Sequence, residues 1–176
     1  ERKGAPAGTP AGPATVSLSD VTLEDQGVLS IYSNIAENNS ESTQTYADLT
    51  LVGDAATSAR TGGTASAGED FDVYNVRSGD GADHVWSIGE AGQKPVTHEL
   101  IGSLGDASGG ISPNVVNGTL RFRDPCQVTH APEFRFGGGR LQFLHDAPVT
   151  FAQPVVVTGA GSVLSLDPDA DPNATG

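Results

Sequence analysis

The sequence predicts an all-β fold, and we interpret it as a right-handed parallel β-helix with coils of 21–22 residues. The first observation is a Gly-x-Leu-x-(Ile/Phe) motif at residues 27–31, 118–122 and 139–143, with a looser copy at 161–166. The glycines of the last three copies lie 21 and 22 residues apart. The second observation is that no segment keeps a helical period of 3.6 residues over three turns. A fixed period with one structural unit per repeat is typical of solenoids, in which each coil buries its apolar face against its neighbours.

An antiparallel β-sandwich or jelly roll is the alternative that the sequence leaves open. The glycine-rich segments 137–139 and 159–161 could each close an antiparallel hairpin. The repeat favours the β-helix, because a sheet built from hairpins has no reason to repeat in groups of three strands. Residues 32–115 do not keep the period, so the interpretation depends mainly on residues 115–166.

The chain divides into an arm, one domain and a tail. Residues 1–14 are rich in Ala, Gly and Pro and hold nothing that could pack in a core, so we expect a linker or an extended arm. Residues 15–166 are expected to form a single all-β domain. Residues 167–176 combine acidic residues with two prolines, which predicts an acidic tail or linker.

Alternation of apolar and polar residues predicts the strands of the N-terminal part. They are expected at 16–18, 21–23, 28–32, 46–52, 71–76, 84–88 and 96–101. Residues 33–45 are expected to form a polar loop. Residues 53–70, mostly Gly, Ala, Ser and Thr, are expected to be the least structured internal stretch, and residues 102–114 a glycine-rich loop.

Each repeat unit from Gly118 onward contains three short strand-like pieces separated by Gly, Pro and Asp. The first unit has them at 118–122, 128–129 and 134–136, and the second at 139–143, 149–150 and 155–157. If the units stack as coils, Arg121 and Gln142 occupy equivalent positions one coil apart.

The composition limits the partners and the location. Nine Lys and Arg against 22 Asp and Glu give a formal net charge of −13, which argues against nucleic acid or an anionic membrane surface as the main partner. No stretch approaches the roughly 20 apolar residues of a membrane span, so we expect no membrane insertion. The chain contains no Met, which suggests a processed product or a piece of something longer. A single cysteine, Cys126, excludes an internal disulfide framework and is expected to be buried and inert.

Four arginines are the candidate ligand-binding residues. Strand alternation turns Arg121, Arg123 and Arg135 outward, because the phenylalanines beside them are expected to face the core, and Arg140 lies at the corner that precedes a repeat unit. A planar guanidinium group can make bidentate contacts with carboxylates or sulfates, so the group could bind an acidic polysaccharide. The alternative is that they are solvated surface arginines on an acidic protein. The four are Arg121, Arg123, Arg135 and Arg140.

One segment predicts a metal site. Residues 78–85, SGDGADHV, resemble one unit of the calcium-binding nonapeptide repeat, with Ser78 in place of the first glycine. Such a site needs ligands from stacked neighbouring repeats and no second copy follows, so an ordinary Asp/Gly turn is the alternative. We expect no cofactor, and Ca²⁺ at Asp80 and Asp83 is the metal that the sequence could accommodate.

The repeat at 115–166 resembles the β-helical passenger regions of bacterial autotransporters and related adhesins, with their G-x-L-x-L runs and Gly/Asn corners. Pectin-lyase-like β-solenoids share this architecture. The resemblance implies a surface-exposed or secreted stalk or adhesin segment. Taken with the arginines, it leads us to expect a non-catalytic structural or adhesive segment located extracellularly, on a cell surface or on a virion surface, with an acidic polysaccharide or a cell-surface glycan as the partner. Uncapped coil ends would also permit a homo-oligomer or a linear assembly.

Two other functions stay open at the level of sequence. One is a β-helical polysaccharide lyase or hydrolase, or a tailspike domain. A lyase needs basic side chains beside carboxylates that hold calcium, and the arginines with Asp124 and Asp146 are the candidates. The other is a jelly-roll carbohydrate-binding module or virion decoration protein, which follows if the strands form hairpins. No residue is assigned a catalytic role.

Overall fold

A computed structural model describes residues 15–33, 44–61, 70–92, 95–123, 126–144 and 153–166. Within these residues the chain forms β-strands joined by turns and no helix. The strands are β1 (Thr15–Glu24), β2 (Val28–Ser33), β3 (Gln44–Val52), β4 (Ala55–Thr61), β5 (Asp70–Ser78), β6 (His84–Ile88), β7 (Val96–Leu104), β8 (Ile111–Val115), β9 (Gly118–Arg123), β10 (Gln127–Val128), β11 (Phe134–Phe136), β12 (Arg140–Leu144), β13 (Val155–Val157) and β14 (Val163–Leu166). The predicted arm at 1–14, the predicted tail at 167–176 and the predicted strand at 149–150 lie outside the described residues.

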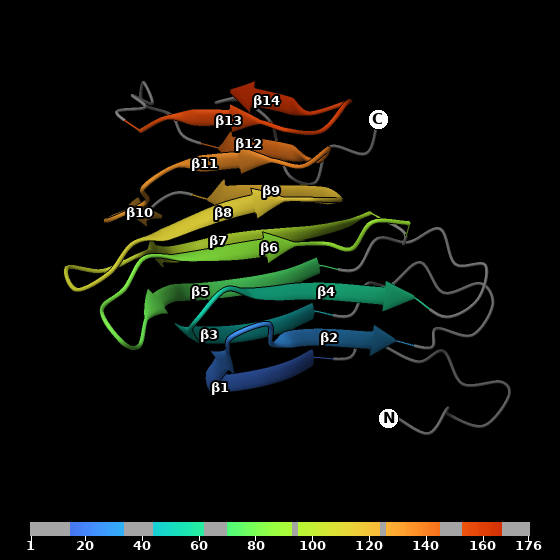
Figure 1. Ribbon diagram of the computed structural model, residues 1–176. Helices are drawn as coiled ribbons and strands as arrows, with labels where there is room; N and C mark the ends of the chain where they lie inside the picture. The colour runs from blue at the N-terminus through green and yellow to red at the C-terminus, as the bar shows by residue number, and fades with distance from the viewer. Residues whose placement is uncertain are drawn as a thin grey trace, which may run out of the picture.

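The strands form two sheets, and every described strand pair is parallel (Figure 1). The eight-stranded sheet, here sheet A, has the order β1-β3-β5-β7-β9-β12-β14, with β10 beside β7. The six-stranded sheet, here sheet B, has the order β13-β11-β8-β6-β4-β2. Apart from β9 and β10, consecutive strands along the chain therefore belong to different sheets. Both sheets run from N-terminal strands at one end to C-terminal strands at the other.

This topology confirms the all-β prediction and contradicts the antiparallel alternative for the described strands. The glycine-rich segments 137–139 and 159–161 do not close hairpins. The first connects β11 of sheet B to β12 of sheet A, and the second connects β13 to β14 in the same sense. These glycines lie where the chain passes from sheet B to sheet A.

The repeat of the C-terminal part sets the strand register of sheet A. Leu141 pairs with Leu120 and Phe143 with Phe122, so equivalent motif positions lie side by side on β12 and β9. The looser copy is displaced by one residue, because Leu141 pairs with Leu164. The first copy differs from the others, because its residues 28–31 lie in β2 of sheet B.

The stretch expected to be least structured and the expected glycine-rich loop both contain strands. β4 lies within 53–70, and β7 with β8 occupies much of 102–114. The inward side chains of β4 are small: Ala55 and Thr57 are buried, and the hydroxyl of Thr57 accepts a hydrogen bond of 2.9 Å from the indole Nε1 of Trp86. The Trp86 side chain thus fills the core space beside β4, so this strand does not need an alternation of large apolar residues.

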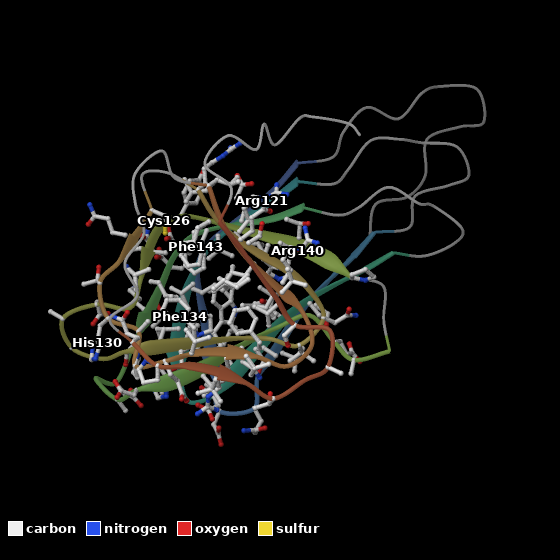
Figure 2. All side chains as sticks on the ribbon, turned by 90° about the horizontal axis from the view of Figure 1, so that it is seen from above. Arg121, Cys126, His130, Phe134, Arg140 and Phe143 are labelled. Atoms are coloured by element: carbon white, nitrogen blue, oxygen red, sulfur yellow. The ribbon has the colours of Figure 1, made fainter. Side chains whose placement is uncertain are left out.

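The core lies between the two sheets (Figure 2). Phe122 and Phe143 stack with ring centroids 4.5 Å apart and planes 2° from parallel. Phe134, from sheet B, packs edge-on against both rings at 6.1 and 6.3 Å. These three rings join the sheets at the C-terminal half and hold β9, the strand that carries Arg121 and Arg123, in place.

Candidate binding surface on sheet A

The candidate site consists of polar side chains on three adjacent strands of sheet A. Glu99 on β7 pairs in register with Arg121 on β9, which pairs with Gln142 on β12. Their chain neighbours Leu100 and Phe122 are buried in the core, so alternation turns the three polar side chains to the outer face. This confirms the expected equivalence of Arg121 and Gln142.

The three side chains and Arg123 form a connected group, here called the Glu99 cluster. Arg121 donates through Nε to Oε1 of Gln142 at 3.1 Å and through Nη1 to Oε2 of Glu99 at 3.4 Å. Arg123 contacts the other carboxylate oxygen of Glu99, Oε1, with Nε at 3.0 Å. The Glu99 carboxylate therefore holds both guanidinium groups, and the amide oxygen of Gln142 holds that of Arg121 from the other side.

The cluster is positively charged and unevenly exposed. The Glu99 side chain is 10% exposed, whereas the side chains of Arg121 and Arg123 are 22% and 45% exposed. A nearly buried carboxylate needs close cationic partners, because loss of hydration is otherwise uncompensated. Two guanidinium groups share the Glu99 carboxylate, and Arg123 is the more exposed of the two. Asp72 on β5 pairs in register with Glu99, so an acidic residue borders the cluster on its other side.

The other two predicted arginines, Arg140 and Arg135, lie outside the Glu99 cluster. Arg140 begins β12, where it pairs with Thr119, and its side chain is exposed on the same sheet (Figure 2). Arg135 lies on β11 of sheet B and forms an ion pair with Glu133. Arg121, Arg123 and Arg140 thus belong to one sheet, and Arg135 does not.

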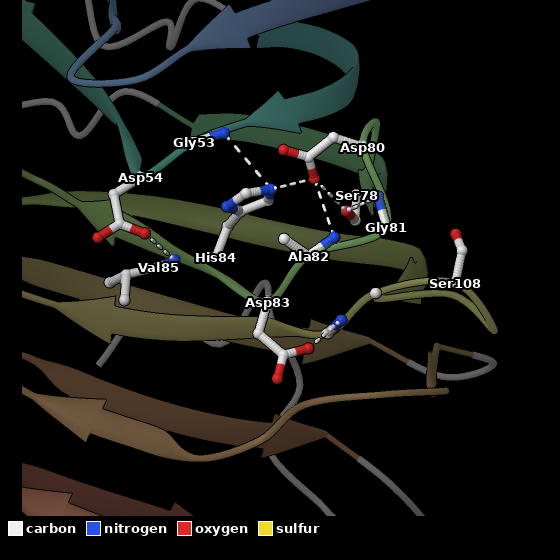
Figure 3. Close-up of polar contacts among 12 residues, drawn as sticks. Gly53, Asp54, Ser78, Asp80, Gly81, Ala82, Asp83, His84, Val85 and Ser108 are labelled. Atoms are coloured by element: carbon white, nitrogen blue, oxygen red, sulfur yellow. Dashed lines mark hydrogen bonds and ion pairs between the residues drawn. The ribbon is translucent and has the colours of Figure 1, made fainter.

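The predicted calcium residue Asp80 is engaged in a turn (Figure 3). Its Oδ1 atom accepts hydrogen bonds from the backbone N of Ala82 at 2.9 Å and from the hydroxyl of Ser78 at 3.2 Å, and lies 2.7 Å from Nε2 of His84. The hydrogen bond from the Ala82 backbone, followed by that from His84, lowers the pKa of Asp80. The backbone N of Gly53 also lies near this ring nitrogen, at 3.4 Å. Because the contact with Asp80 is shorter, we assign Nε2 of His84 as the donor and Oδ1 of Asp80 as the acceptor.

Asp83 has a different role from Asp80. Its Oδ1 accepts a hydrogen bond of 2.8 Å from the backbone N of Gly110, 27 residues further along the chain. Asp54 does the same for the backbone N of Val85 at 2.8 Å. Asp83 thus links the β5–β6 connection to the β7–β8 connection, and Asp54 links the β3–β4 connection to strand β6 (Figure 3). Over the part of the chain that the structure describes, no group of three or more His, Cys, Asp or Glu residues is arranged to hold a metal ion.

The single cysteine is buried next to β10. Burial raises the pKa of the Cys126 thiol to about 12. The thiol is therefore protonated at neutral pH, and a protonated thiol is a poor nucleophile and metal ligand.

No helix among the described residues is both long and apolar enough to span a membrane.

Comparison with models of known protein families, with curated proteins and with solved structures gave no match. The function must therefore be inferred from the site itself. Sequence analysis did not single out Glu99, the anchor of the cluster. A signal was present, because Glu99 precedes Arg121 by 22 residues and Arg121 precedes Gln142 by 21, close to the period of the repeat.

Proposed function

We propose that the two sheets are two faces of a right-handed parallel β-helix that serves as a non-catalytic structural or adhesive segment of a secreted or surface-displayed protein. Sheet A binds acidic polysaccharide through Arg121, Arg123 and Arg140. Support for the β-helix comes from the alternation of parallel strands between two sheets, and right-handed crossovers are the strong preference of parallel strands. The short β10 beside β7 is the start of a third side.

The observation that carries the binding proposal is the Glu99 cluster. On a chain with a formal net charge of −13, two arginines are held on one strand by a single nearly buried carboxylate. Fixing a guanidinium group beforehand reduces the entropy lost on binding an anion. Arg121 and Arg123 lie two residues apart on β9, and Arg140 lies opposite Thr119 on the neighbouring strand β12. The two strands therefore present several guanidinium groups on one face of sheet A to a polymer of repeated carboxylates or sulfates.

The test is binding of the purified chain to immobilised polygalacturonate and heparin, with dextran as the neutral control. Arg123→Ala combined with Arg140→Ala is expected to weaken binding to the acidic polymers at least tenfold. Binding of the unchanged chain should weaken as salt rises, because the attraction is between exposed charges.

Two single variants, and the double variant that combines them, provide controls for the arginine change. Arg77→Ala removes an arginine of sheet A whose side chain is 44% exposed, against 45% for Arg123. Arg135→Ala removes the arginine of sheet B. All three variants are expected to bind as the unchanged chain does. Equal loss in all variants would show that only overall charge matters, and absence of binding to any acidic polymer would overturn the proposal. Analysis of the polymer for shortened chains after incubation separates binding from cleavage.

A further inference from the structure

The charged residues of sheet A divide it into an acidic part and a basic part. Strands β1, β3, β5 and β7 carry six acidic residues and a single arginine, Arg77, which is paired with Asp20 at 3.2 Å. Strands β9 and β12 carry three arginines and no acidic residue, and β14 carries no charged residue. The basic part of sheet A is therefore two strands wide, with acidic strands on one side and an uncharged strand on the other.

The three arginines of this basic part extend further along the strands than across them. Arg140 lies opposite Thr119, and Arg121 and Arg123 follow Thr119 at intervals of two residues on β9. At about 3.3 Å per residue, the first and the last arginine are about 13 Å apart along the strand direction, whereas the two strands are about 4.8 Å apart. The basic part is thus a short band that runs parallel to β9.

The hydrogen bonds within the band leave donor groups for a ligand. Arginine has no acceptor atom, so the bond of 3.1 Å from Nε of Arg121 turns Oε1 of Gln142 toward Arg121 and leaves the amide NH2 group as a donor on the other side. Nε of Arg123 is directed to Glu99 at 3.0 Å, which leaves the edge with the two Nη groups pointing away from Glu99. Such an edge matches the two oxygens of a carboxylate or sulfate group.

We propose that an acidic polysaccharide lies along β9 and β12, parallel to the strands, and that the band takes a short segment with one anionic group for each arginine. This inference rests on the proposed function, in which Arg121, Arg123 and Arg140 bind the polymer. A polymer in this orientation meets all three cations in succession. A polymer that crossed the strands would pass from Arg121 over the in-register positions of Glu99 and Asp72, where like charges repel it.

The experiment adds one arginine in each of the two directions and measures the affinity for galacturonate and heparin oligosaccharides of defined length by calorimetry. Thr119→Arg adds a cation on β9, in line with Arg121 and Arg123. Ser165→Arg adds the same charge on β14, in register with Gln142 across the strands. Both positions are half-buried, so the two variants are matched in charge and exposure. In 0.15 M salt, where charges are screened beyond about 8 Å, any general effect of net charge is small.

Thr119→Arg is expected to raise the affinity about threefold, as one added exposed ion pair would, while Ser165→Arg leaves it unchanged. A larger gain from Ser165→Arg would show that the polymer crosses the strands, and equal gains would show that only charge matters. Either result would overturn the proposed orientation. Circular dichroism and urea unfolding establish that both variants fold.

The length of the oligosaccharide gives a second test that needs no variant. The affinity of the unchanged chain should rise until the oligosaccharide spans the band of about 13 Å and then level off. A steady rise with every longer oligosaccharide would contradict a short segment. If the unchanged chain binds no acidic oligosaccharide or polymer, the proposed function itself fails. Failure of the orientation alone leaves binding, and its loss on Arg123→Ala with Arg140→Ala, intact.

Discussion

The Nε atom of Arg123 lies 3.0 Å from Oε1 of Glu99, while Nη1 of Arg121 lies 3.4 Å from Oε2 of the same carboxylate. The two arginines are separated by one residue on β9, and the carboxylate lies on the neighbouring strand β7. The carboxylate thus offsets the repulsion between two cations on the same side of one strand. Both the stability of sheet A and its proposed binding surface depend on this arrangement.

Glu99→Gln is expected to lower the free energy of unfolding by about 1–3 kcal/mol, because it replaces charge-assisted bonds and leaves two guanidinium groups side by side. Urea unfolding followed by circular dichroism measures the change. Arg77→Ala, which removes an exposed ion pair with Asp20, is the control and should cost at most about 1 kcal/mol. Equal stability of Glu99→Gln and the unchanged chain would contradict the structural role of the carboxylate.

Two glycines with the same backbone angle allow a test of how the connections stack. Gly89 and Gly92 both have φ of 79°. A Cβ atom on Gly89 would lie 1.8 Å from the carbonyl O of Asn117, whereas one on Gly92 would meet nothing within 4 Å. Alanine at either position carries the cost of the left-handed conformation, about 1–2 kcal/mol.

We expect Gly89→Ala to lower the free energy of unfolding by about 1–3 kcal/mol more than Gly92→Ala does, because backbone must shift to relieve the overlap. Parallel urea titrations of the two variants give the difference directly. If the two variants were equally stable, the close approach of Gly89 to Asn117 would be wrong, and with it the stacking of these connections.

Burial of His98 predicts a pH dependence of stability. Burial lowers the pKa of His98 from 6.5 to about 3, so the ring is neutral in the folded chain at neutral pH. Because this folded-state pKa is depressed, the unfolded chain binds a proton below pH 6.5 that the folded chain does not, and stability falls as pH decreases from there toward about 3. The loss from pH 7 to pH 5 is expected to be about 2 kcal/mol.

The measurement is the free energy of unfolding at pH 7 and pH 5 for the unchanged chain and for His98→Phe. The variant should lose the part of the pH dependence that His98 causes, whatever its absolute stability. His130→Gln, at an exposed histidine, should keep the full dependence. The same slope in His98→Phe and the unchanged chain would exclude His98 as its cause.

The sequence was informative where side chains repeat and uninformative where loops vary. The pairing of Leu120 with Leu141 follows from the 21-residue spacing of their motifs, because both fill equivalent core positions. From β1 to β8, paired positions are instead 26 to 31 residues apart. Connections of unequal length change this spacing without changing the core, so no single period is visible there.

The candidate site was predictable only in part, for a related reason. Alternation beside Phe122 was sufficient to predict that Arg121 and Arg123 face outward. Alternation alone could not show that Arg140 lies on the same sheet as these two arginines and Arg135 on the other, because this depends on which sheet each strand joins. It also could not single out Glu99, because a surface glutamate and a nearly buried one look the same until the neighbouring strand is known.

The most direct test of the account is the affinity of Glu99→Gln for immobilised heparin and polygalacturonate at low salt. Removing the carboxylate leaves both guanidinium groups unfixed, so the variant should bind the acidic polymers more weakly than the unchanged chain and be less stable to urea. Unchanged or tighter binding by a folded Glu99→Gln variant would contradict the claim that Glu99 holds Arg121 and Arg123 ready as the binding surface of sheet A.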